Sequence, residues 1–115
     1  MVALQVAMAP LADLMEVGER VAEAIRGRDV LMVASTDFSH YVAPEVAAAE
    51  DRWALDAIVR GDPTGLYEVV ARRGISMCGI APTTVMLAAL RGRADSTRLL
   101  KYGHSGEVTP MPEVV

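Results

Sequence analysis

The chain has 115 residues, of which 52% are apolar and 23% charged, and its formal net charge is −4. This length suits one domain, and the composition is that of a packed globular protein, which excludes a disordered chain. A single lysine, and no basic run longer than Arg72-Arg73, exclude a typical nucleic-acid-binding face. One cysteine excludes an internal disulfide and predicts a reducing, cytoplasmic setting. No apolar stretch approaches the roughly 20 residues that span a membrane.

The first third of the chain predicts a strand, a helix and a second strand. Residues 2–9 form an apolar run closed by Pro10, which is typical of a strand buried on both faces. In residues 11–27 the apolar side chains recur every three or four positions up to a glycine, which predicts an amphipathic helix. Residues 29–35, DVLMVAS, form a second apolar run rich in branched side chains. This order makes a βαβ unit, so the two strands are expected to be parallel.

Three further helices are predicted downstream. Pro44 opens a helix that Gly61 ends, with Trp53 on its inner face as the one large ring of an otherwise aliphatic core. Residues 62–74 begin with an Asp-Pro pair and end with a glycine, which predicts a capped helix. Residues 82–90 form an apolar helix that a later glycine closes.

The architecture expected from these elements is a single α/β piece over residues 1–115, three-layered, with a mostly parallel sheet flanked by helices. Residues 97–102, TRLLKY, supply its last strand. Three or four strands leave at least one apolar edge bare, and a bare edge invites pairing. We therefore expect an incomplete half of a fold, with self-association as one consequence.

Polar residues crowd the carboxyl end of the second predicted strand, where ligand crevices form in open α/β sheets. Asp37 and His40 can face one crevice there, with the carboxylate orienting the imidazole as a general acid–base or a metal ligand. The alternative is that Asp37 caps a turn while His40 packs beside Tyr41, and the spacing alone favours this alternative. Ser39 and His40 point to opposite sides of extended backbone, which excludes a serine hydrolase pair.

Two further candidates lie downstream. Cys78 precedes the predicted helix that Pro82 opens, and helix N–H groups suit a thiolate, which indicates a metal ligand or reactive thiol. The alternative, more common for a lone cysteine, is a small buried apolar side chain. His104 follows the last predicted strand and could line the same crevice, although a histidine in a glycine turn more often lies on the surface. With two histidines in all, these residues do not complete the roughly three ligands of a catalytic metal site.

Four segments resemble, in order and spacing, the C-terminal part of the MEMO-like family: STDFSHY (35–41), DAIVR (56–60), CGIAPTTVMLAAL (78–90) and LLKYGHSGEV (99–108). The resemblance implies a fold related to the class III extradiol dioxygenases. In bacteria and archaea it implies protein B of the AmmeMemoRadiSam system, which accompanies a radical SAM enzyme and an AMMECR-like protein. These two proteins, or a peptide, are the partners that the resemblance implies.

The resemblance also implies roles for three residues. Cys78 stands where the dioxygenases place a carboxylate ligand, and His40, with Asp37 as its acidic partner, matches their acid–base histidine. In the complete protein, Cys78 and His40 would hold an iron or copper ion for a redox or dioxygenase-like reaction. Two further histidine motifs are expected in an N-terminal half that this chain lacks, so it carries half a site. The alternative is a non-enzymatic module that binds a peptide or partner, and no family role transfers to His104.

Overall fold

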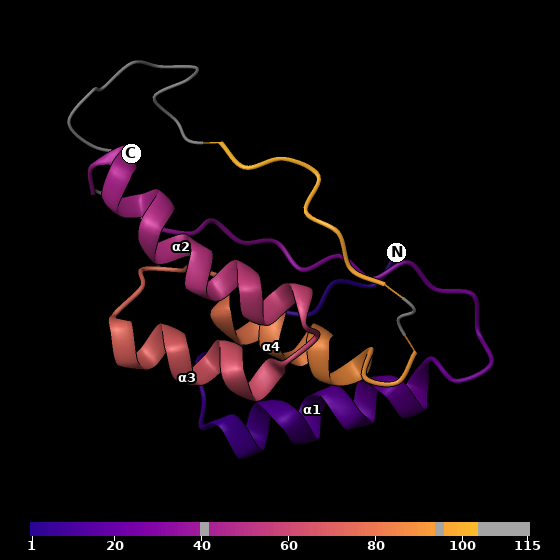
Figure 1. Ribbon diagram of the computed structural model, residues 1–115. Helices are drawn as coiled ribbons and strands as arrows, with labels where there is room; N and C mark the ends of the chain where they lie inside the picture. Colours follow the sequence, from indigo (N-terminus) through magenta and orange to yellow (C-terminus); the bar gives the residue numbers. More distant parts are fainter. Residues whose placement is uncertain (40–41, 94–95, 104–115) are drawn as a thin grey trace.

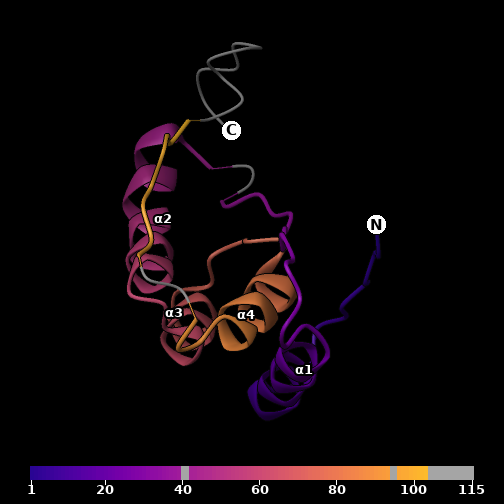
Figure 2. The same cartoon turned by 90° about the vertical axis from the view of Figure 1, so that its right-hand side faces the viewer.

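The regular structure of this protein is helical. The computed structural model describes residues 1–39, 42–93 and 96–103, and within these ranges the chain forms four helices. They are α1 (Leu11–Ala24), α2 (Pro44–Val59), α3 (Pro63–Arg73) and α4 (Ile80–Ala89). Helix α4 packs between α1 and α3, and α3 packs against α2, so the helices form one curved layer (Figure 1, Figure 2). In the described ranges no helix is both long and apolar enough to cross a bilayer.

The predicted α/β architecture is wrong, because the described residues contain no strand and therefore no parallel sheet. The three predicted strands fall in residues 1–9, 29–39 and 96–103, which run as extended chain over one side of the helix layer (Figure 1, Figure 2). An apolar run favours extended backbone, but a strand also needs a hydrogen-bonded neighbour, and these segments form no ladder with one another. The same finding contradicts the three-layer, extradiol dioxygenase-like fold that the resemblance implied.

The predicted first helix is confirmed, and a glycine sets how closely it approaches α4. Leu14 is buried in the contact, and Gly18 lies on the same face one turn later. A Cβ at position 18 would lie 2.5 Å from the Cβ of Ala88 and 2.9 Å from the carbonyl oxygen of Val85. Such distances are far inside van der Waals contact, so only glycine allows this separation of the two helices.

The third helix is also confirmed, with the capping groups that the sequence predicted. The side chain of Asp62 accepts a hydrogen bond from the amide of Gly65 at 2.9 Å, and Pro63 occupies the first turn. Gly74 ends the helix in the left-handed conformation, with φ of 62°. Leu66, fully buried, points from this helix into the main apolar cluster.

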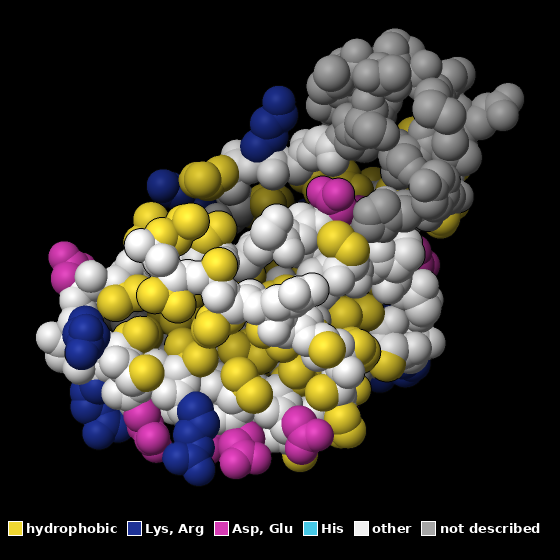
Figure 3. Space-filling model, turned by 180° about the vertical axis from the view of Figure 1, so that it is seen from behind, with side chains coloured by type: hydrophobic (Ala, Val, Ile, Leu, Met, Phe, Trp, Pro, Cys, Tyr) yellow, Lys and Arg dark blue, Asp and Glu magenta, His cyan; other side chains and the backbone are white. Residues whose placement is uncertain are grey.

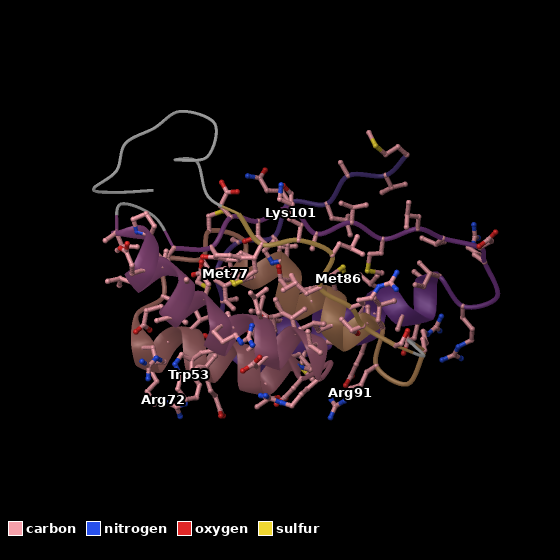
Figure 4. The ribbon with its side chains drawn as sticks, turned by 45° about the horizontal axis from the view of Figure 1, so that its top comes forward. Trp53, Arg72, Met77, Met86, Arg91 and Lys101 are labelled. Carbon is pink, nitrogen blue, oxygen red and sulfur yellow. The ribbon has the colours of Figure 1, made fainter. Side chains whose placement is uncertain are left out.

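Trp53 does not lie in the core, contrary to the prediction. Its side chain is 49% exposed, and the guanidinium of Arg73 lies 4.7 Å from the centre of its ring. The same guanidinium donates two hydrogen bonds to Glu50, which lower the pKa of Glu50 and raise that of Arg73. Figure 4 shows Trp53 and Arg72 together at the outer side of α2 and α3, where both line a shallow groove. The buried stripe of α2 is instead made of small residues and one carboxylate: Ala47, Asp51, Ala54 and Ala57.

We predict that Gly18→Val lowers the free energy of unfolding by about 1–3 kcal/mol, because the added atoms overpack the contact between α1 and α4. Urea unfolding followed by helical circular dichroism measures this change. Ala24→Val, at an exposed position of the same helix, is the matched control and is expected to have a much smaller effect. Equal stability of the two variants would contradict the packing assigned to Gly18.

Candidate functional site

The candidate site forms where residues 35–39 meet the chain just before α4. The amide of Asp37 donates a hydrogen bond to the Sγ atom of Cys78 at 3.1 Å, and the amide of Cys78 donates to the carbonyl of Asp37 at 3.2 Å. The amide of Gly79 donates to Oγ1 of Thr36 at 2.8 Å. Two segments about forty residues apart in sequence are therefore held side by side at the N-terminus of α4.

Gly79 permits this close approach. A Cβ at this buried position would collide with the side chain of Thr36 and with the carbonyl oxygen of Ser35. Any other residue would push the 35–37 segment away from the start of α4, since both colliding groups are anchored close to the backbone. The glycine therefore sets the distance between Asp37 and Cys78.

The thiol of Cys78 is exposed, which contradicts the alternative of a small buried apolar side chain. Cys78 directly precedes Gly79, the N-terminal cap of α4. An amide donor therefore meets the sulfur beside the start of a helix, where backbone N–H groups lack helical partners. These surroundings suit a metal ligand or a reactive thiol.

The structure brings together two of the three predicted site residues. Asp37, an exposed residue, meets Cys78, whereas His40 lies outside the described residues, as does His104. In the described part of the chain no cluster of three or more His, Cys, Asp or Glu side chains could hold a metal ion. Asp37 meets Cys78 through its backbone amide and carbonyl, so the thiol is the one side-chain donor that the described contacts place here, and such sites use about three protein ligands.

Sequence reasoning missed a buried carboxylate next to this site. Asp51 of α2 is only 2% exposed, and its Oδ1 accepts hydrogen bonds from the amide of Ser39 at 3.0 Å and from the hydroxyl of Ser39 at 2.5 Å. Its Oδ2 accepts a hydrogen bond from the hydroxyl of Tyr102 at 2.6 Å. The available signal was the spacing from Ala47 to Asp51 and on to Ala54, which places a carboxylate on the buried stripe of the helix.

The bond to Asp51 affects the acidity of Tyr102. Partial burial of the phenol raises its pKa, and the hydrogen bond to Asp51 and the negative charge of that carboxylate raise it further. The folded chain therefore keeps Tyr102 protonated at pH values where an unfolded chain would ionise it. Tyr102 can donate to Asp51 throughout the neutral range.

The geometry defines a layer of helices with an exposed thiol beside a polar segment. Comparisons with known proteins show the family to which such a chain belongs. A family model described as "Memo-like protein" matches residues 1–115. A MEMO1 family protein from Methanococcoides burtonii is 43% identical over 103 residues, covering 87% of this chain and 39% of that protein. MEMO1 family proteins from Methanothermobacter thermautotrophicus and Methanopyrus kandleri are 43% and 37% identical, covering 82% and 90% of this chain.

The chain belongs to the Memo-like family. It spans little more than a third of the length of these relatives, between 35% and 39%. The family predicted from the sequence is therefore confirmed.

We predict that Tyr102→Phe makes stability less dependent on alkaline pH. In the wild type the raised pKa of Tyr102 contributes stability that is fully present below the ordinary value of 10.0 and is lost as the pH rises through the folded-state pKa. Phenylalanine removes this contribution, so the fall in unfolding free energy above pH 10 should become shallower. Chemical unfolding at a series of pH values measures the slope. A wild-type slope above pH 10 in Tyr102→Phe would contradict this role of the hydrogen bond to Asp51.

Proposed function

We propose that this chain supplies part of the metal site of a Memo-like protein, with Cys78 as a thiolate ligand. The observation that carries the proposal is the exposed Sγ of Cys78 at the start of α4, facing the amide of Asp37. Thiolates bind iron, copper and zinc ions, and polar segments positioned by a rigid scaffold are a common place for such ligands. His40 is the second proposed ligand, and with Asp37 it forms the proposed acid–base pair.

The described donors alone do not complete a site, so the remaining ligands must come from elsewhere. We place the chain in the C-terminal part of the Memo-like architecture and assign the other ligands to His40 and to the portion of the relatives that this chain does not match. An iron or copper ion held there would supply redox or dioxygenase-like chemistry to the whole protein. The contribution of this chain is to present the thiolate and to orient a proton-carrying side chain beside it.

Metal binding by three forms of the protein tests this proposal. Anaerobically purified wild type, Cys78→Ser and His40→Ala are titrated with Co²⁺, whose bond to sulfur gives a charge-transfer absorption band. We expect each substitution to weaken Co²⁺ binding by at least about tenfold, and Cys78→Ser to abolish the band. Circular dichroism establishes that each variant keeps its helices. Equal binding by all three forms would refute the assignment.

A second candidate function is the binding of a polypeptide by the extended segments. From residue 31 to residue 38 exposed and half-buried side chains alternate, so that Leu31 and Val33 face away from the helices at 90% and 79% exposure. Leu100, on another extended segment, is 84% exposed. Apolar side chains also form a broad band across the face seen from behind (Figure 3). Apolar surface of this kind marks interaction sites.

We propose that the partner is the portion of a Memo-like chain that this sequence does not match, because the relatives are more than twice as long. That portion of the Methanococcoides burtonii protein is added to the chain, and light scattering after gel filtration measures complex formation. Leu31→Asp should weaken the complex by at least about tenfold. Val17→Asp, at an exposed position of α1, is the control and should leave the complex unchanged. A homodimer would point to a second copy as the partner, and binding only to a radical SAM or AMMECR-like protein would point to that companion.

A further inference from the structure

We infer that Asp51 is a positioning residue for the Cys78 site, acting through Ser39 and the backbone of Asp37. This inference deepens the proposed function, since Cys78 is the proposed metal ligand. According to this inference, the buried carboxylate of Asp51 on α2 fixes the 29–39 segment, which forms no β-ladder. Among the described residues Asp51 makes no hydrogen bond to Cys78, so its effect on the thiol would be indirect.

The hydrogen bonds of Asp51 account for both of its oxygen atoms. Oδ1 accepts the amide and the hydroxyl of Ser39, and Oδ2 accepts the hydroxyl of Tyr102. A carboxylate that is 98% shielded from solvent has to be compensated by donors, and here the donors come from two segments far apart in the sequence. One side chain of α2 therefore ties both the 29–39 segment and the 96–103 segment to the helix layer.

The position of Ser39 connects this carboxylate to the thiol. Ser39 follows Asp37 by two residues, and the amide of Asp37 is the donor to Sγ of Cys78. The other side of the segment is fixed by Gly79, whose amide binds Thr36. The stretch from Thr36 to Ser39 is therefore held at one end by α4 and at the other by Asp51. Loosening the second attachment should let the amide of Asp37 move away from the sulfur.

Glu50 provides a matched control for Asp51. It is the adjacent carboxylate on the same helix, and its two hydrogen bonds come from Arg73 on α3 rather than from the 35–39 segment. Glu50→Ala therefore removes a hydrogen-bonded carboxylate from α2 without touching the 35–39 segment. Asp51→Asn is the conservative variant, because its amide oxygen can still accept both hydrogen bonds from Ser39.

Amide hydrogen exchange of the whole chain, followed by NMR, tests the inference without any metal. We expect Asp51→Ala to accelerate exchange at Asp37 and Ser39 by about tenfold while the amides of α4 keep their rates. Asp51→Asn should retain the wild-type rate at Asp37. A wild-type rate at Asp37 in Asp51→Ala, or an equal acceleration in Glu50→Ala, would overturn the inference.

Co²⁺ titration supplies the second readout. Asp51→Ala should weaken binding by about tenfold, as the loss of an indirect support for a ligand does, and Glu50→Ala should leave it unchanged. If the wild type binds no Co²⁺, the proposed function fails while amide exchange still decides the role of Asp51.

If Asp51→Ala does not fold, Ser39→Ala replaces it, since it removes the hydroxyl bond alone. Unchanged exchange at Asp37 in that variant would count against the inference.

Discussion

A few hydrogen bonds, most of them involving side chains, hold the extended segments of this protein to its helices in place of a backbone ladder. Tyr67 of α3 donates to the carbonyl of Ala9, and Asp51 of α2 accepts from both Ser39 and Tyr102. A ladder would spread the attachment along the whole segment, whereas the described hydrogen bonds lie at a few positions: Ala9, residues 36–39 and Tyr102. The placement of any chemistry carried by these segments therefore depends on a few polar side chains of the helix layer.

The helix layer itself depends on small residues at its contacts. Gly18 brings α1 close to α4, and the alanines at 47, 54 and 57 form the buried stripe of α2. Trp53, in contrast, lies at the edge of the layer, where its ring stacks with the guanidinium of Arg73 instead of filling the core. Close packing of this kind gives the start of α4 a rigid setting, and Cys78 stands directly before it.

Two contacts around Cys78 support the proposal that this chain supplies part of a metal site. A glycine admits a second segment to the helix terminus, and the amide of that segment meets the sulfur. The exposed side chains of Leu31, Val33 and Leu100 and the greater length of the relatives support the same proposal. The proposed ligands and the exposed apolar side chains therefore both support the proposal that further polypeptide completes the site.

Local signals in the sequence determined the helices, the capping residues of α3 and the membership of the family. Proline, aspartate and glycine act through neighbouring backbone, so positions such as Asp62 and Gly74 could be interpreted without knowledge of the fold. Only the tertiary structure decided that the apolar runs remain unpaired, that Trp53 lies at the surface and that Asp51 is buried. Pairing and burial depend on which distant segments meet, and the contact between Asp37 and Cys78, 41 residues apart, is of the same long-range kind.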